Sequence, residues 1–382
     1  MSVTFPLGFL ASGVNCGLKE KEKDIALVIN KGPKFDAAAV FTSNQVKAAP
    51  VLWSMEVLKS LKLKAVLLNS GGANACTGSK GFQNTHKSAE LAAELLDCGA
   101  SDIAVCSTRL IGKHLDMEKI STGIKNLVKN ISVDGGIPAA EAILTTDSHI
   151  KIVSLDQGNF KIGAMIKGAG MLAPDLATML CVITTDADIS NLNFKLGLQK
   201  AISKTLNRLD SDGCTSTNDS VILMSSGASG YLPAEEEFQT ALLKVLNELS
   251  QLLINDAEGS TKNIQINILN AQTEEDAVEI GRLIARNNLL KCAFFGEDPN
   301  WGRILAAIGN SKANIDQQTI DVSINDVLVC KSGESCSNES KVNLGNRNIK
   351  VDVDLKIGDK NATILTNDLS IKYVHENSAY SS

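Results

Sequence analysis

The chain has 382 residues, of which 44% are hydrophobic, 21% charged and 4% aromatic, with a formal net charge of −6. This length indicates two or three domains, or fewer for a long α/β fold. The negative charge argues against nucleic-acid binding, no apolar run approaches the roughly 20 residues of a membrane span, and residues 1–6 lack the features of a secretory signal. We therefore expect a cytoplasmic protein that binds neither nucleic acid nor membrane.

Short apolar runs between turn residues predict a mixed structure in the first third of the chain. The expected strands are 24–30, 37–42, 65–68 and 103–106, and the expected helix is 87–96. A glycine-rich loop, 69–78, follows the third strand, which is typical of a phosphate cradle. The loop matches neither GxGxxG nor GxxxxGK[ST], so a tight crossing of buried backbones is the favoured interpretation.

The next segment is predicted to be a helix at 138–144, ending at Thr145-Thr146-Asp147, followed by a hairpin. The strands of this hairpin are 149–154 and 159–166, with a Gly-containing turn between them. Lys167 closes the second strand. On residue type alone, an exposed lysine at a strand end is as good an interpretation of this residue as a functional lysine.

Residues 167–186 are predicted to form a stiff, irregular segment followed by a buried strand. Glycines and a proline precede Thr178, and the apolar run 179–183 then reads as a core strand. A hydroxyl at the mouth of such a strand suits self-cleavage: Thr178 Oγ attacks the Ala177 carbonyl, an N→O acyl shift follows, and water completes the cut. The freed α-amino group, with a pKa of about 7.7–8.0, would then act as base for its own hydroxyl. On residue type alone, a threonine entering a strand is usually structural.

Helices and strands also alternate in the second half of the chain. We expect helices at 196–206, 234–254 and 273–288, the last with a capping box from Thr273 to Asp276. We expect strands at 221–224 and 263–269, then at 319–322, 327–330, 349–355 and 362–365. The pattern predicts an α/β or α+β fold with a smaller C-terminal β-rich lobe.

Nine scattered cysteines without a CxxC pair, and four scattered histidines, give no zinc spacing. We expect reduced thiols that mostly pack in the core, and we expect no metal or tightly bound cofactor.

Several of these segments, in the same order, resemble the ornithine acetyltransferase family (the ArgJ family, glutamate N-acetyltransferases of arginine biosynthesis). The likeness is carried by 167–178 with Thr184-Thr185-Asp186, by the loop 69–78, by Phe295-Gly-Glu-Asp-Pro-Asn-Trp-Gly-Arg303, and by the terminal 373–382. It covers essentially the whole chain. It implies an α/β/β/α sandwich, cut before Thr178 into fragments 1–177 and 178–382. Residues 178–262 would complete the sandwich and 263–382 would form the smaller lobe, in an α2β2 assembly.

The resemblance also implies residue roles. Thr178 would be the nucleophile, with the cut between Ala177 and Thr178, and Thr108 with the backbone N–H of Arg109 would form the oxyanion hole. The family has glycine at position 109. The arginine keeps the N–H, but it would be strained if that position needs a positive φ, and it would crowd the pocket. Without the resemblance, a solvated arginine in a turn is an equally good interpretation of Arg109.

The substrate contacts implied by the resemblance come from five places. They are Thr145 (with Thr146 as the alternative), Lys167, Glu258, Asn377 and Ser382, where the family ends in threonine. Lys167 would bind a substrate carboxylate and would also favour the neutral form of the Thr178 amine. Glu258 would suit the cationic end of ornithine. Its alternative interpretation is a solvated turn residue.

The expected reaction is a ping-pong transfer of acetyl from acetylornithine to Thr178 and then to glutamate, with acetyl-CoA as a second donor if the enzyme is bifunctional. Two alternatives remain open. One is an N-terminal-nucleophile aminopeptidase or amidase of the same architecture. The other is an uncleaved binding protein in which Arg109 has disabled the oxyanion hole.

Overall fold

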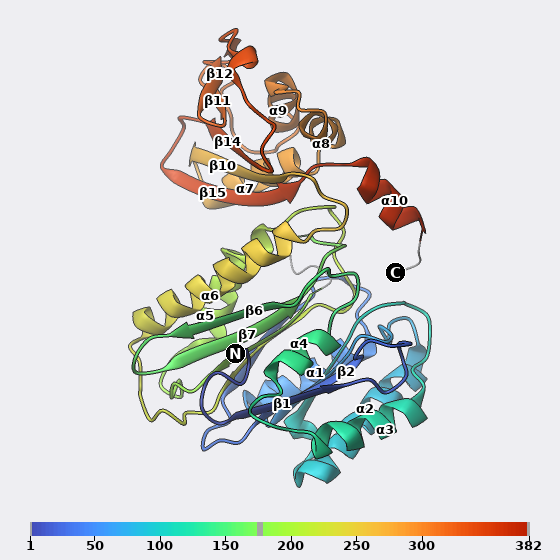
Figure 1. The fold of residues 1–382 in the computed structure, drawn as a ribbon. Helices are drawn as coiled ribbons and strands as arrows, with labels where there is room; N and C mark the ends of the chain where they lie inside the picture. Colours follow the sequence, from blue (N-terminus) through green and yellow to red (C-terminus); the bar gives the residue numbers. More distant parts are fainter. Residues whose placement is uncertain (1, 174–178, 380–382) are drawn as a thin grey trace.

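The computed structural model describes residues 2–173 and 179–379, which form two stacked sheets, their flanking helices and a separate C-terminal lobe (Figure 1). The stacked sheets lie in the lower part of Figure 1, and the lobe lies above them. Helices cover the outer face of each stacked sheet. The predicted α/β/β/α sandwich with a smaller C-terminal lobe is confirmed.

The first sheet has the strand order β1-β2-β4-β5. Its strands are β1 Phe9–Val14, β2 Ile25–Asn30, β4 Ala65–Asn69 and β5 Ile103–Ser107. Every residue of β2, β4 and β5 is buried, because α2 (Gly78–Leu96) and α3 (Met117–Lys129) cover one face and the second sheet covers the other. Strands β4 and β5 are parallel, so their carboxyl ends meet at one edge.

The second sheet has the order β3-β9-β8-β7-β6. Its strands are β3 Ala37–Phe41, β6 Lys151–Asp156, β7 Lys161–Lys167, β8 Leu180–Thr185 and β9 Ser220–Ser225. Helices α5 (Phe194–Ser203) and α6 (Glu235–Asn255) pack on its outer face. The end of β7 pairs with the start of β8 through Lys167 and Leu180, and Leu180 is in register with Ser220 of β9. Three strand ends therefore meet at one edge.

A shared apolar core joins the two sheets. Val28 and Leu68 of the first sheet pack in one cluster with Val182 and Ile222 of the second, and all four side chains are fully buried. The short helices α1 (Ala49–Val57) and α4 (Gly136–Ala142) close the sides of this core. At about 25 cal/mol per Å² of buried apolar surface, such a layer fixes the two sheets relative to each other.

The C-terminal lobe is a six-stranded sheet of order β13-β12-β11-β14-β10-β15 with three helices on one face. Its strands are β10 Asn263–Ala271, β11 Asp321–Ile324, β12 Val327–Lys331, β13 Glu334–Ser335, β14 Asn348–Asp354 and β15 Lys360–Asn367. The helices are α7 Glu274–Ala285, α8 Asn288–Phe295 and α9 Trp301–Ile308. A last helix, α10 (Ile371–Ala379), leaves the lobe and runs back toward the sandwich (Figure 1).

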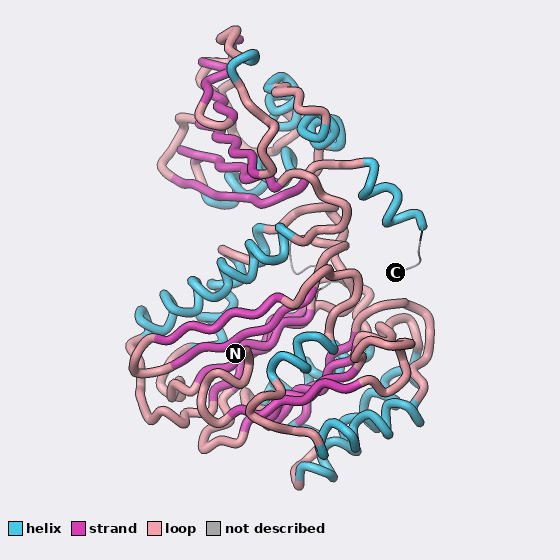
Figure 2. The backbone as a smooth tube through the Cα atoms, viewed as in Figure 1, coloured by secondary structure: helices cyan, strands magenta, loops and turns pink. Residues whose placement is uncertain are grey.

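Most predicted elements occur with shifted ends, as the tube in Figure 2 allows the reader to follow. Helix α2 begins at Gly78, nine residues before its predicted start, because its polar first turns are held by packing: Trp53 contacts the rings of Phe82 and His86. Both strands of the hairpin begin two residues later than predicted: β6 begins at Lys151 and β7 at Lys161. The helix start at Thr273 is confirmed, since its side chain accepts a hydrogen bond from Asp276 N at 3.1 Å.

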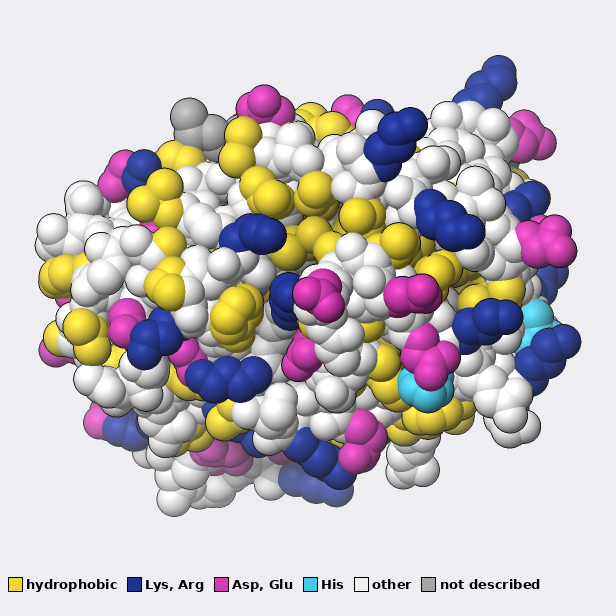
Figure 3. Space-filling view, turned by 90° about the horizontal axis from the view of Figure 1, so that it is seen from below, with side chains coloured by type: hydrophobic (Ala, Val, Ile, Leu, Met, Phe, Trp, Pro, Cys, Tyr) yellow, Lys and Arg dark blue, Asp and Glu magenta, His cyan; other side chains and the backbone are white. Residues whose placement is uncertain are grey.

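The described helices include none that is long and apolar enough to cross a bilayer. On the face shown in Figure 3, basic and acidic side chains are interspersed rather than gathered by sign. All nine cysteines are free. The expectation that most of them pack in the core is wrong: only Cys106, Cys181 and Cys330 are buried, because the others lie on loops or on partly exposed faces of helices.

Candidate active site

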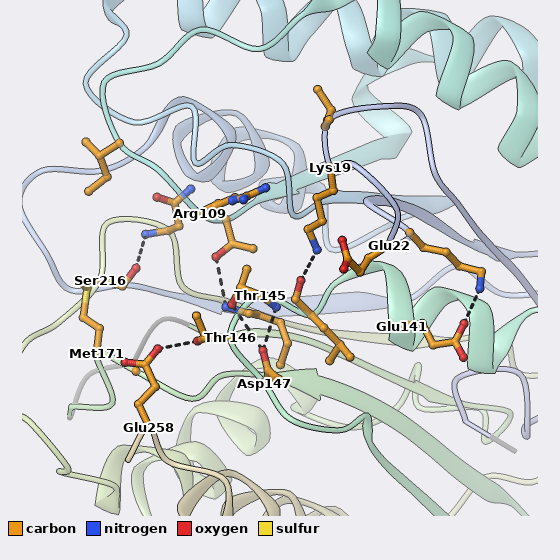
Figure 4. A pocket seen from close by; sticks show the side chains of 18 of the residues that line it. Lys19, Glu22, Arg109, Glu141, Thr145, Thr146, Asp147, Met171, Ser216 and Glu258 are labelled. Carbon is orange, nitrogen blue, oxygen red and sulfur yellow. Dashed lines mark hydrogen bonds and ion pairs between the residues drawn. The ribbon is translucent and has the colours of Figure 1, made fainter. Parts of the chain in front are cut away.

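A cavity of about 1350 Å³ opens where the strand ends of both stacked sheets meet (Figure 4). Its walls come from segments far apart in the sequence: the loop 18–23, the residues after β5, the residues after α4, the end of β7, the approach to β9, and the turn after α6. Of the residues predicted from the sequence, it brings together Thr108, Arg109, Thr145, Lys167, Glu258 and Asn377. Ala177, Thr178 and Ser382 lie outside the described residues.

Thr108 is held rigidly at the carboxyl end of β5. Its N–H donates to the Asn69 carbonyl at 3.0 Å, and its side chain is 1% exposed. The Asn218 amide braces the preceding residue by donating to the Ser107 carbonyl at 2.8 Å. The buried Lys167 ammonium donates to Thr108 Oγ1 at 3.3 Å. A hydroxyl fixed in this way can serve as an oxyanion donor without reorganising during the reaction.

Arg109 adopts a φ of 110°, a conformation that favours glycine. The predicted strain is therefore present, at a cost of order 1–3 kcal/mol. The side chain is exposed and lines the cavity. Within 2–173 and 179–379, no residue makes a hydrogen bond or ion pair with its guanidinium.

Lys167 and Asp147 form the charged floor of the cavity. Asp147 Oδ1 accepts from Gly168 N and from Lys151 Nζ, both at 2.7 Å, and its Oδ2 accepts from Thr145 N at 3.0 Å. Burial works to raise the pKa of Asp147, but the charges of Lys167 and Lys151 outweigh it and lower that pKa to about 2. Burial lowers the pKa of Lys167, and the charge of Asp147 opposes this shift.

Thr146 and Glu258 meet across the cavity wall. Thr146 Oγ1 donates to Glu258 Oε1 at 2.6 Å, and Glu258 N donates to the Ala169 carbonyl at 2.9 Å. A Cβ at Gly170 would lie 2.4 Å from Glu258 Oε2, so this glycine makes room for the carboxylate. Both Thr145 and Thr146 line the cavity, and the choice between them as the substrate contact stays open.

The start of β8 is anchored by Asp219. Met179 N donates to Asp219 Oδ1 at 3.0 Å, and the carboxyl group is fully buried. Burial raises the pKa of Asp219 well above its usual value. Its Oδ2 has no hydrogen-bond partner in the described parts of the chain.

Lys19, in the loop 18–23, extends over the cavity beside Glu22 and on the same side as Arg109 (Figure 4). Its ammonium donates to the Leu144 carbonyl at 2.5 Å. Burial, and then the like charge of Arg109, lower the pKa of Lys19 to about 8.

Three residues of the site were not predicted from the sequence: Lys19, Asp147 and Asp219. For the two aspartates a signal existed, because each ends a Thr-Thr-Asp or Thr-Asn-Asp segment next to a strand. Lys19 gave none, since it lies in an alternating run of lysine and glutamate that reads as a solvated loop. Asn377 lines the cavity from α10, and its predicted contact with substrate stays a prediction.

The described residues contain no group of three or more His, Cys, Asp or Glu side chains arranged to hold a metal ion. The polar groups of the cavity are instead hydroxyls, ammonium groups and carboxylates. These are suited to binding an amino acid and to stabilising a tetrahedral oxyanion.

Comparison with known proteins extends over the whole chain. The model of the ArgJ family matches residues 10–382. The arginine biosynthesis bifunctional protein ArgJ of Streptomyces coelicolor is 54% identical over 383 residues, covering 100% of both chains. The protein of the same name from Mycobacterium tuberculosis is 49% identical over 389 residues, covering 100% of this chain and 96% of that one. Among solved structures, ornithine acetyltransferase complexed with ornithine, from Mycobacterium tuberculosis, is 49% identical and covers 47% of this chain and 96% of that chain, with a TM-score of 0.45. From the match along 10–382 and the identity over the full length, the chain belongs to the ArgJ family.

Proposed function

We propose that this protein transfers the acetyl group of N2-acetylornithine to glutamate, with Thr178 as the acyl carrier. Two facts support the proposal: the chain belongs to the ArgJ family, and its full-length relatives are named as bifunctional proteins of arginine biosynthesis. The observation that carries it is geometric. Thr108 and Lys167 border one cavity, Lys167 Nζ lies 3.3 Å from Thr108 Oγ1, and Lys167 pairs with Leu180 at the start of β8.

The first half-reaction forms the acyl-enzyme. The neutral α-amino group of Thr178 takes the proton of Oγ as this oxygen attacks the acetyl carbonyl. Thr108 Oγ1 and the N–H of residue 109 stabilise the oxyanion. The C–N bond then breaks, and the proton moves from the α-amino group to the departing ornithine amine. In the second half-reaction the neutral amine of glutamate attacks the Thr178 ester and gives a proton to the α-amino group. The ester C–O bond then breaks, this proton passes to Thr178 Oγ, and N-acetylglutamate leaves.

Binding of the two amino acids follows from the charges of the cavity. The buried ammonium of Lys167 suits the α-carboxylate that both substrates share, and Glu258 suits the cationic side chain of ornithine. Thr145 or Thr146, Asn377 and Ser382 complete the substrate contacts in this proposal. Acetyl-CoA is the second donor if the protein is bifunctional, as its relatives are named.

We further propose that the chain cuts itself between Ala177 and Thr178, in the cytoplasm, to give an α2β2 assembly of fragments 1–177 and 178–382. The amine that activates Thr178 exists only after this cut. Asp219 supports the cut indirectly, since it holds Met179 N at 3.0 Å and so fixes the backbone next to the bond.

The test is a denaturing gel with intact-mass measurement. The wild-type protein should give two fragments that begin at residues 1 and 178, and Thr178→Ala should remain in one piece. The Thr178→Ser variant is the matched control, since it keeps a hydroxyl and should still be cut. A single intact chain with full transferase activity would contradict the proposal.

The activity assay mixes the purified protein with acetylornithine and glutamate, first without and then with acetyl-CoA. Formation of N-acetylglutamate without acetyl-CoA is the expected result. Release of free acetate in its place would favour the aminopeptidase or amidase alternative, in which water takes the acyl group. An uncut chain with neither activity would favour the binding-protein alternative.

A further inference from the structure

Arg109 combines backbone strain with a charge that nothing in the described chain neutralises. Its φ of 110° is one that L-residues rarely adopt, and its guanidinium lines the cavity without a hydrogen bond or ion pair from residues 2–173 and 179–379. A strained residue persists when the surrounding structure holds it, and such residues cluster at ligand sites. The unmatched charge identifies the ligand group as an anion.

The neighbouring charges do not satisfy Arg109. Lys19 lies on the same side of the cavity, and Figure 4 shows the Arg109 side chain extending toward it. Glu22 lies beside Lys19 rather than beside Arg109 (Figure 4). Asp147 is already bound to Lys151 at 2.7 Å, and Glu258 accepts from Thr146 at 2.6 Å. Within residues 2–173 and 179–379, no carboxylate therefore pairs with Arg109.

The position of Arg109 relates this positive region to the reacting centre. Arg109 directly follows Thr108 in the chain, and in the proposed function the Thr108 hydroxyl donates to the oxyanion. In glutamate, the side-chain carboxylate lies about 5 Å from the α-nitrogen when extended, from bond lengths of about 1.5 Å. An arginine side chain has a similar reach, and its fork of N–H groups matches a carboxylate.

We propose that Arg109, with Lys19, forms an anion subsite that binds the side-chain carboxylate of a dicarboxylic amino acid as acetyl acceptor. This inference rests on the proposed function, because it assigns the acceptor of that same site. It also explains how one cavity takes two substrates of opposite side-chain charge: Glu258 serves the cationic donor, and Arg109 serves the anionic acceptor.

The test compares glutamate with glutamine, its uncharged isostere, as acceptors from the same acyl-enzyme. The readout is the ratio of their kcat/KM values, in which effects on the oxyanion hole cancel. Arg109→Gly, which keeps the N–H and relieves the strain, should lower this ratio at least tenfold, as expected for loss of a charge-assisted hydrogen bond. Arg109→Gln should do the same, and Arg109→Lys should restore part of the preference.

The matched control is Lys80→Gln, which removes an exposed positive charge from α2, away from the cavity, and should leave the ratio unchanged. An unchanged ratio in Arg109→Gly would overturn the inference. It would also be overturned if Arg109→Gly raised the KM for acetyl-CoA and left the ratio alone, since the phosphates of the thioester donor would then be the anion.

A binding measurement separates this inference from the proposed function. In thermal-shift titrations of the wild-type protein, glutamate should stabilise more than glutamine, and Arg109→Gly should abolish the difference. If this holds but no acetyl is transferred, the proposed function fails and the anion subsite stands. If acetyl is transferred but neither the kinetic ratio nor the thermal shift depends on Arg109, only the anion subsite fails.

Discussion

Replacing Asp147 by asparagine should weaken both the stability of the protein and the order of its cavity. The carboxylate side chain is 0% exposed and accepts hydrogen bonds from Thr145 N, Gly168 N and Lys151 Nζ. Asparagine keeps one acceptor oxygen but turns the other into an NH₂ donor. That donor would face an N–H or an ammonium, each of which is also a donor.

The magnitude follows from the pKa of Asp147. The carboxyl group has a pKa of about 2 in the folded protein and an ordinary value of 3.8. Because the folded pKa is the lower one, the stabilisation is complete above the unfolded pKa and is lost as the pH falls through about 2. A difference of roughly two pKa units corresponds to about 2.5 kcal/mol at pH 7. With an unfolding entropy of about 2.1 cal/mol/K per residue, this would lower the Tm by about 3 °C for a chain that unfolds as one unit.

The assay is thermal or denaturant unfolding of the wild-type protein and Asp147→Asn between pH 2 and pH 7. The variant should be less stable at pH 7, and the gap should close as the pH falls from about 4 to about 2. Asp359→Asn is the control, since that aspartate is 82% exposed and should change little. Equal stability at pH 7, or a gap that does not depend on pH, would refute the reasoning.

Three further predictions concern the site. Thr108→Val should lower kcat for acetyl transfer by roughly 10²–10³ with little change in the KM for acetylornithine, whereas Thr108→Ser should keep most activity; a Val variant within threefold of wild type would contradict the oxyanion role. The KM for glutamate should rise above about pH 8, where Lys19 loses its charge; Lys19→Gln should remove that rise, and an identical profile in both proteins would count against Lys19. Gly259→Ala should displace α10, because φ is +62° and the new Cβ would lie 2.3 Å from Tyr373 N; the expected loss is about 1–3 kcal/mol, and protease resistance of residues 371–379 equal to wild type would argue against it.

The sequence predicted elements whose pattern is local. Strand β2 could be predicted because its sequence is a nearly continuous apolar run, and all six of its residues are buried in the structure. Helix α6 could be predicted because apolar side chains recur at helical spacing. Helix α3 was missed, although Ile120, Ile124 and Leu127 form a buried stripe. The charged and polar residues between them, and the glycines nearby, masked the period.

The charged floor of the site could not have been predicted from local pattern. Lys151 pairs with Asp147 and with Asp256, which lies 105 residues further along the chain. Only the fold brings these groups together. In the same way, the sequence could raise the question of strain at Arg109, but the φ of 110° had to come from the structure.

The pairing of β7 with β8 has a consequence for any molecule cut at position 178. These strands lie on opposite sides of the cut yet are joined by a full antiparallel ladder, and β3 from the first half pairs with β9 from the second. Neither half can leave without exposing the edge strands and apolar core that the other half covers. The two fragments made from one chain should therefore not dissociate. When two isotopically distinct preparations are mixed, no fragment should be exchanged between them.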